Sequence, residues 1–262
     1  KHLVVQGIHS EGLAATDLDG DGRVEIVHGP DWFAQPPSGP YSGLWRRITY
    51  APDIRDMVRI LLCDITGNGL PDIVLVESEY RDGRLAWFEN RLRERPEAPW
   101  VCHELERGLV FAHSLDLWPT GNLDERAFFL AEMARGGWSQ PYNYDARLLR
   151  YVTRDRGATW QREELDHGSG THQAVVVDID GDSQPEVVGK EWDTPRVQVW
   201  KQPAKPSLPI RYKHRFIDRD KPTTGVDLLI ADVDGDGVHD VICGAWWYQN
   251  PTWIRRQIPG IY

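Results

Sequence analysis

The sequence predicts an all-β fold, namely a small β-propeller with five four-stranded blades. An acidic loop recurs along the chain at spacings of 47 to 62 residues, and a period near 50 residues accommodates four short strands with their turns. The loops are flanked by short β-branched runs bounded by Gly, Pro and Asp, which is typical of strands. No segment shows the periodicity of an amphipathic helix of normal length, so we expect almost no helix. The loops start at Asp17, Asp64, Asp178 and Asp232, with a degenerate copy at Asp116.

Each repeat is predicted to contain four strands in the same order. Inner strands, which enter the acidic loops, are predicted at Leu13–Thr16, Val58–Cys63, Ser114–Leu117, Ala174–Val177 and Asp227–Ala231. Second strands leave the loops at Val24–His28, Ile73–Glu77, Ala127–Glu132, Glu186–Lys190 and Val241–Gly244. Third strands carry an aromatic residue and are predicted at Leu85–Phe88, Leu148–Val152, Val197–Trp200 and Trp246–Tyr248. Outer strands follow at Trp45–Thr49, Trp100–Leu105, Trp160–Leu165, Tyr212–Ile217 and Trp253–Ile258.

The repeats predict one propeller domain over residues 1–262. The blades are expected near residues 9–50, 55–106, 111–166, 171–218 and 223–262. Propellers often close by letting one terminus complete the sheet that the other terminus begins, which removes a free sheet edge. Either residues 1–8 or the segment Ile254–Ile258 can fill that place in the last blade, and the sequence does not decide between them.

The acidic loops have the spacing of calcium ligands. In the first loop, side-chain oxygens stand at positions 1, 3, 5 and 9, and position 7 offers a backbone carbonyl. This spacing wraps a loop around one hard cation, and the intervening glycines permit the left-handed turns that the loop requires. The predicted ligands of the three complete loops are Asp17, Asp19, Asp21 and Glu25; Asp178, Asp180, Asp182 and Glu186; and Asp232, Asp234, Asp236 and Asp240.

The other two loops are incomplete. The Asp64 loop carries Thr66 and Asn68 at positions 3 and 5, so it should bind a cation weakly or be held by hydrogen bonds alone. An EF-hand is excluded, because it requires a glutamate at position 12 and flanking helices. The alternative is a set of Asp/Gly turns without metal, but three near-complete copies at a regular period favour structural calcium.

These loops and strands resemble the FG-GAP/VCBS repeat family, the integrin-type propellers with calcium loops. The resemblance covers nearly the whole chain. It implies a calcium-binding propeller fold and leaves function open, because such propellers serve in adhesion, sugar binding, secreted enzymes and scaffolds.

A propeller would bring a second group of polar residues together at the end of its axis opposite the acidic loops. The loops that enter the inner strands and those that leave the second strands meet there. Histidines, acids, basic residues and tryptophans at one face suit a carbohydrate site, with polar groups in the sugar-ring plane and an aromatic ring against its apolar face. The alternative is that Glu132, Lys190 and Glu191 only pair with one another. The candidate catalytic residues are His9, Glu11, His113, Glu132, His172, Lys190 and Glu191.

A narrower resemblance concerns chemistry. The run from Thr171 to Asp182 is similar to a blade of the propeller domain of aldos-2-ulose dehydratase, and the stretch from Arg84 through His113 is similar to another blade. That family eliminates water from keto-sugars with a metal in a propeller cleft. The resemblance therefore implies that His113 and His172 are candidate ligands of zinc or another divalent metal. The chain lacks the family's cupin domains and has fewer blades than its seven.

Two functions remain open. In the first, the protein is a metal-dependent carbon–oxygen lyase or dehydratase that acts on a keto-sugar or a uronic-acid-containing saccharide, with a His, Glu or Lys as the base. In the second, it is a lectin-like or adhesive module that binds carbohydrate without chemistry. A converging histidine cluster favours the first function, and tryptophans spread between the blades favour the second.

Composition limits the partners and the compartment. The net charge of -10 and the pI near 5.4 argue against a nucleic-acid partner, since the chain would repel phosphates. No apolar run approaches the roughly 20 residues that span a bilayer. The three cysteines have no metal-ligand spacing. Because low-affinity calcium loops suit the millimolar calcium outside cells, we expect a secreted or periplasmic protein.

Overall fold

The protein is described by a computed structural model, which covers the chain except residues 1–2, 8, 97–98, 136–140, 193, 203–211, 223–224, 226 and 262. The described residues contain twenty strands and no helix. The predicted all-β class is therefore confirmed. The strands form five four-stranded sheets, and every strand pair within them is antiparallel.

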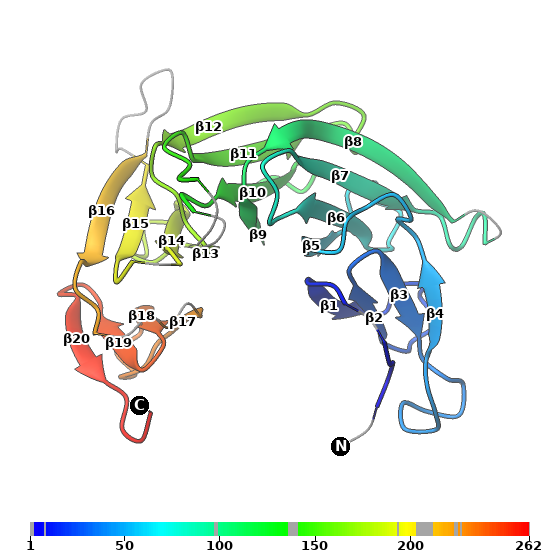
Figure 1. Cartoon of the computed structure of the whole chain (residues 1–262), viewed down its shortest axis with the longest axis horizontal. Helices are drawn as coiled ribbons and strands as arrows, with labels where there is room; N and C mark the ends of the chain where they lie inside the picture. Colours follow the sequence, from blue (N-terminus) through cyan, green and yellow to red (C-terminus); the bar gives the residue numbers. More distant parts are fainter. Residues whose placement is uncertain are drawn as a thin grey trace. The chain divides into compact units, whose positions relative to one another are not determined.

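Each sheet is a simple up-and-down meander of four consecutive strands (Figure 1). The first sheet contains β1 (Leu13–Thr16), β2 (Glu25–His28), β3 (Asp31–Ala34) and β4 (Arg46–Thr49). The second contains β5 (Val58–Cys63), β6 (Asp72–Glu77), β7 (Gly83–Asn90) and β8 (Trp100–Leu109). The third contains β9 (Ala112–Leu117), β10 (Arg126–Glu132), β11 (Arg147–Thr153) and β12 (Gln161–His167). The fourth contains β13 (Gln173–Val177), β14 (Glu186–Lys190), β15 (Val197–Lys201) and β16 (Lys213–Asp218). The fifth contains β17 (Leu228–Ala231), β18 (Asp240–Cys243), β19 (Trp246–Gln249) and β20 (Ile254–Gln257).

The strands follow the sequence repeats closely, with one omission. The third strand of the first repeat, β3, was not predicted. It follows β2 after the two residues Gly29 and Pro30, and Gly29 has a φ of +57°. A strand of only four residues directly behind such a tight turn is easily mistaken for a loop. At the C-terminus, β20 supplies the outer strand of the fifth sheet. At the N-terminus, residues 3–7 form no strand, and the Val4 carbonyl accepts a hydrogen bond from Trp45 N at 3.0 Å.

The chain divides into two compact units. Unit 1 contains Lys1–Ala112 with Asp155–Thr159, and unit 2 contains His113–Arg154 with Trp160–Tyr262. Within unit 1 the inner strands β1 and β5 contact each other, and within unit 2 β13 contacts β17 in the same way. The first and second sheets, and likewise the fourth and fifth, thus approach one another through equivalent strands.

Alternation of side chains builds a hydrophobic layer on each face of a sheet. In β14, successive residues point to opposite faces, so Val187 packs with Trp200 and Phe129 towards the third sheet, whereas Val188 packs with Val241 towards the fifth sheet. All five residues of β14 are buried as a consequence. In unit 1, a comparable layer joins Val27 and Trp32 of the first sheet with residues of the second sheet.

Two buried asparagines tie neighbouring sheets together in the same manner. Asn90 Nδ2 donates to the Leu18 carbonyl of the preceding sheet at 2.8 Å and to the Pro71 carbonyl at 3.0 Å. In unit 2, Asn250 Nδ2 donates to the Ile179 carbonyl at 2.6 Å and to the His239 carbonyl at 3.0 Å. The side chains of both asparagines are almost completely buried.

We expect Asn90→Ala and Asn250→Ala each to lower the free energy of unfolding by about 2–4 kcal/mol. Each substitution removes two donated hydrogen bonds and leaves buried carbonyl groups without these donors, and Asn90→Ala also removes the bond that Asn90 Oδ1 accepts from Leu92 N. Gln35→Ala is the matched control, because it removes a single solvent-exposed hydrogen bond to Val24 O and should change stability by less than about 0.5 kcal/mol. Denaturant unfolding measures all three variants. Losses no larger than that of the control would show that the asparagines do not hold the sheets together.

Candidate functional site

The three complete acidic loops adopt the same conformation. The first aspartate folds each loop around its own carboxylate: Asp17 accepts hydrogen bonds from the backbone N–H groups of Gly20, Asp21 and Gly22. Asp178 and Asp232 accept bonds from the corresponding backbone groups at 2.7–3.1 Å. Gly20 has a φ of +77°, which is the left-handed conformation expected at that position.

Three of the four predicted side-chain ligands converge in each loop. Oxygen atoms from positions 1, 3 and 9 lie within 4.8 Å of one another in all three loops. The aspartate at position 5 does not join this cluster. It caps the loop instead, as where Asp21 Oδ1 accepts from Arg23 N at 2.8 Å, and Asp182 and Asp236 do the same. The converging residues are Asp17, Asp19 and Glu25; Asp178, Asp180 and Glu186; and Asp232, Asp234 and Asp240.

The residue at position 9 approaches each cluster from the strand that follows the loop. Glu25 is 1 % exposed, and its Oε2 accepts from Leu18 N at 2.8 Å. Glu186 is equally buried, and its Oε2 accepts from Ile179 N while its buried Oε1 makes no hydrogen bond to the described residues. Burial raises the pKa of Glu25 to about 7, and the neighbouring aspartates add to this effect. A buried carboxylate among other carboxylates is stabilised when a cation joins it, so these residues can hold a metal ion.

The Asp64 loop shows that the same backbone forms without the extra carboxylates. Asp64 accepts from Gly67, Asn68 and Gly69 N–H groups. The position-9 residue, Asp72, has no exposed surface and accepts three backbone hydrogen bonds at 2.8–3.1 Å, from Ile65, Thr66 and Asn90. Hydrogen bonds therefore hold this loop in its conformation. Burial outweighs these donors and raises the pKa of Asp72 from 3.8 to about 6.

This shift predicts a pH-dependent stability. Because the pKa of Asp72 is raised in the folded state, its contribution is fully present below pH 3.8 and is lost as the pH rises through about 6. In excess chelator, wild-type stability should therefore exceed that of Asp72→Asn by more at pH 5 than at pH 7.5. Groups such as Glu25 titrate in both proteins and cancel in the comparison. Thermal melts at the two pH values measure the difference, and an equal difference would contradict the assignment.

A second candidate site lies in unit 2, where His113 and His172 are stacked. Their ring centroids are 3.9 Å apart with an interplanar angle of 28°. His113 belongs to β9 and is 5 % exposed, and His172 directly precedes β13. The ring of Trp192 stacks on His172 at a centroid distance of 6.3 Å. The equivalent places of the two histidines in their repeats thus bring their rings into contact.

A hydrogen bond to a backbone carbonyl identifies Nδ1 of His113 as a donor. Its Nδ1 lies 2.8 Å from the backbone carbonyl of His172, which also accepts from Ser114 Oγ. A carbonyl only accepts, so Nδ1 carries a proton. A backbone carbonyl on one ring nitrogen is the usual partner of a histidine that binds metal through the other.

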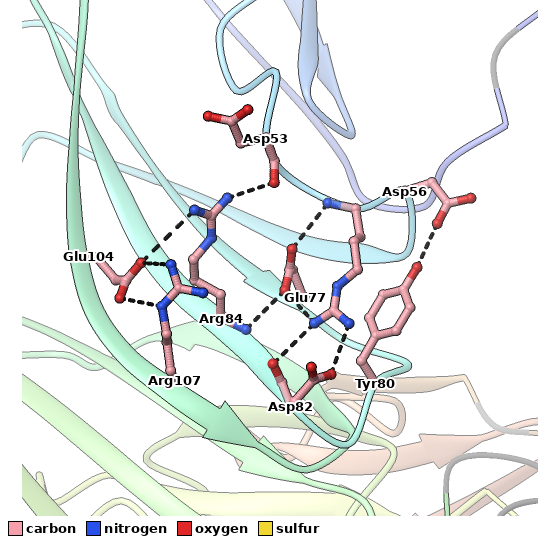
Figure 2. A network of polar contacts seen from close by, with 9 residues as sticks. Asp53, Asp56, Glu77, Tyr80, Asp82, Arg84, Glu104 and Arg107 are labelled. Carbon is pink, nitrogen blue, oxygen red and sulfur yellow. Dashed lines mark hydrogen bonds and ion pairs between the residues drawn. The ribbon is translucent and has the colours of Figure 1, made fainter.

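Glu132 is held by an arginine. Arg147 donates to both of its carboxylate oxygens, at 2.6 Å to Oε1 and 2.9 Å to Oε2. The corresponding residue of unit 1 is Glu77, whose Oε2 accepts a hydrogen bond from the Arg55 guanidinium at 2.6 Å. Glu77 lies in a wider network of arginines and acids (Figure 2). Arg55 also lies over the ring of Tyr80, at 3.7 Å from its centroid. An arginine-bound glutamate at the end of the second strand is therefore a recurring structural feature, and Glu132 is poorly placed to accept a proton from a substrate.

Lys190 is connected to the histidine pair by a backbone hydrogen bond, and Glu191 follows it in the sequence. Lys190 has no exposed surface, and its ammonium donates to the carbonyls of Glu191 and Trp192. Its own carbonyl accepts from His172 N at 2.9 Å. Glu191 is 4 % exposed and lines a cavity of about 290 Å³ whose other lining residues include Tyr142, Thr194, Arg196, Gln198 and His214. This polar cavity was not predicted, because its residues come from segments of the third and fourth sheets that no motif connects.

The remaining two candidates belong to unit 1. His9 is exposed, and Glu11 forms an ion pair with Arg59 at 3.2 Å. Glu11 N also donates to the Asp56 carbonyl at 3.0 Å. The candidate catalytic residues are thus divided between the units, with five of the seven in unit 2.

Comparison with other proteins adds no assignment: no protein-family model and no curated protein matches this chain. Among the described residues, no helix is long and apolar enough to cross a membrane.

Proposed function

We propose that the chain is a five-bladed, calcium-stabilised β-propeller of the FG-GAP/VCBS type. The five meanders support the propeller, as do the contacts between the inner strands β1 and β5 and between β13 and β17, since blades meet through these strands. The convergence of positions 1, 3 and 9 in three loops supports calcium, which prefers carboxylate oxygens. Calcium serves stability in this proposal, because each loop connects the first two strands of a sheet.

We further propose that unit 2 carries a metal-dependent lyase or dehydratase site for a keto-sugar or a uronic-acid-containing saccharide. The observation that carries this proposal is the stacked pair His113 and His172, with Nδ1 of His113 on a carbonyl. A divalent metal such as zinc, held by the two imidazoles, would polarise the sugar carbonyl and acidify the adjacent C–H bond.

Glu191 is the best-placed base in this reaction. Its carboxylate lines the polar cavity, whereas Glu132 is bound by Arg147 and the Lys190 ammonium is bound by carbonyls. Glu191 would remove the acidified proton, the electrons of the C–H bond would form a C=C bond, and the hydroxyl on the next carbon would leave as water after protonation. Trp192 and Tyr142 would offer aromatic surface to the sugar.

Assay of the purified protein with keto-sugars and uronates, with and without added zinc or manganese, tests this proposal. Formation of an unsaturated product, measured by its ultraviolet absorbance, is the expected result, and Glu191→Gln should abolish it. Saccharide binding by calorimetry without any product would instead favour the alternative, a lectin-like or adhesive module. Secretion or a periplasmic location accords with either function, because both use calcium at extracellular concentrations.

A further inference from the structure

Lys201 lies beside the carboxylates of the Asp178 loop. It is the last residue of β15, and because Val187 pairs with Trp200, Lys201 lies at the level of Glu186, the position-9 ligand of the Asp178 loop. This placement follows from the strand register and therefore from the backbone. The contact between Lys201 and the Asp178 loop was not predicted from the sequence, because Lys201 lies fifteen residues beyond Glu186.

The Lys201 ammonium contacts three of the four predicted ligands of the Asp178 loop. It hydrogen-bonds Asp180 and donates to Asp182 Oδ2 at 2.7 Å. It also lies 3.5 Å from Glu186 Oε1, the buried oxygen that makes no hydrogen bond to the described residues. A single exposed ion pair contributes little, but a network that includes a buried carboxylate is held more firmly.

Within the described part of the chain, no lysine ammonium occupies this place in the other two complete loops. Ile26 pairs with Phe33, which sets the small apolar Ala34 at the level of Glu25. Val241 pairs with Tyr248, which sets Gln249 at the level of Asp240, and its neutral amide donates to Asp234 Oδ2 at 2.6 Å. Arg23 is paired with Asp21 in the first loop, and Asp21 lies outside the converging cluster.

We propose that Lys201 is a built-in cation that closes the Asp178 loop to calcium, so that the chain holds two calcium ions, in the Asp17 and Asp232 loops, and not three. This inference rests on the proposed calcium binding. A calcium ion at Asp180 and Glu186 would lie in contact range of the ammonium, so it could bind only after Lys201 had left and the like charges had separated. The Asp178 loop thereby keeps its shape at any calcium concentration, as the Asp64 loop does through hydrogen bonds.

Counting bound calcium tests the inference. Equilibrium dialysis of the full chain should give two ions per wild-type chain and three per Lys201→Met chain, since methionine keeps the apolar stem and removes the charge. Lys213→Met is the matched control. Lys213 pairs with Lys201 across the sheet, and no ion pair connects it with the loop in the described part of the chain. That control removes the same charge from the neighbouring strand and should still bind two ions.

A second measurement needs only the wild-type protein. In hydrogen exchange, calcium should slow the loop amides of Gly20 to Gly22 and of Gly235 to Gly237, and should leave those of Gly181 to Ser183 unchanged.

The outcomes separate the inference from the proposal beneath it. Three ions on the wild-type chain, or two on Lys201→Met, would overturn the role of Lys201 and leave calcium binding intact. Three ions on Lys213→Met would overturn it as well, because the effect would then be one of net charge. No bound calcium on any of the chains would overturn the calcium proposal itself.

Discussion

Replacing His172 with alanine should lower turnover of a keto-sugar or uronate substrate by at least about 100-fold under the proposed lyase function, because that function makes His172 a metal ligand whose loss weakens both metal binding and carbonyl polarisation. The same variant should retain less zinc than the wild type after loading with zinc and dialysis, measured by elemental analysis. Its calcium-dependent melting temperature should stay close to that of the wild type, because among the described residues neither histidine belongs to the clusters of the Asp17, Asp178 and Asp232 loops.

A second stacked histidine provides the control for this variant. His103 stacks on Trp87 at a centroid distance of 4.2 Å, and its Nε2 donates a hydrogen bond to Glu89 Oε2 at 3.1 Å. His103→Ala therefore removes a comparable aromatic contact in unit 1 and should leave turnover unchanged. A His172→Ala protein that keeps both its metal and its turnover would exclude the histidine pair as the metal site.

The fold was largely predictable because the repeat is periodic. The inner strand Val58–Cys63 and the second strand Glu186–Lys190 have the predicted bounds, since acidic loops and β-branched runs mark them on both sides. The strand β3 could not be recognised from four residues behind a Gly-Pro turn. The division into two compact units left no mark in composition or linkers, because the repeat continues through it.

The loops were predictable only as far as local spacing determines them. Spacing placed Asp17, Asp19 and Glu25 together, and their oxygens converge. It could not separate Asp21, which caps a backbone N–H, from true cluster members, because both uses require an aspartate. Lys201 depends on strand register, which relates residues that are far apart in sequence. For Asn90 and Asn250 a signal did exist: each lies at the end of a third strand, Asn90 as the last residue of β7 and Asn250 directly after β19.

Removing calcium should have the largest effect on stability. A ligand that binds only the folded state adds about 2.7 kcal/mol per site at one hundred times its dissociation constant. For two sites, saturating calcium should therefore raise the free energy of unfolding by about 5 kcal/mol. At roughly 2–4 °C per kcal/mol for a chain of this size, excess chelator should lower the melting temperature by about 10–20 °C, measured by calorimetry.

Variants in the acidic loops show which residues produce the calcium-dependent rise in melting temperature. Asp17→Asn should remove part of the calcium response, because it weakens a ligand in unit 1 and leaves the Asp232 loop of unit 2 intact. Asp64→Asn is the matched control: Asp64 accepts the same three backbone hydrogen bonds as Asp17, but its loop lacks the converging carboxylates. It should therefore destabilise the protein equally with and without calcium. A wild-type melting curve that is unchanged in excess chelator would show that the acidic loops are turns held by hydrogen bonds, as the Asp64 loop is.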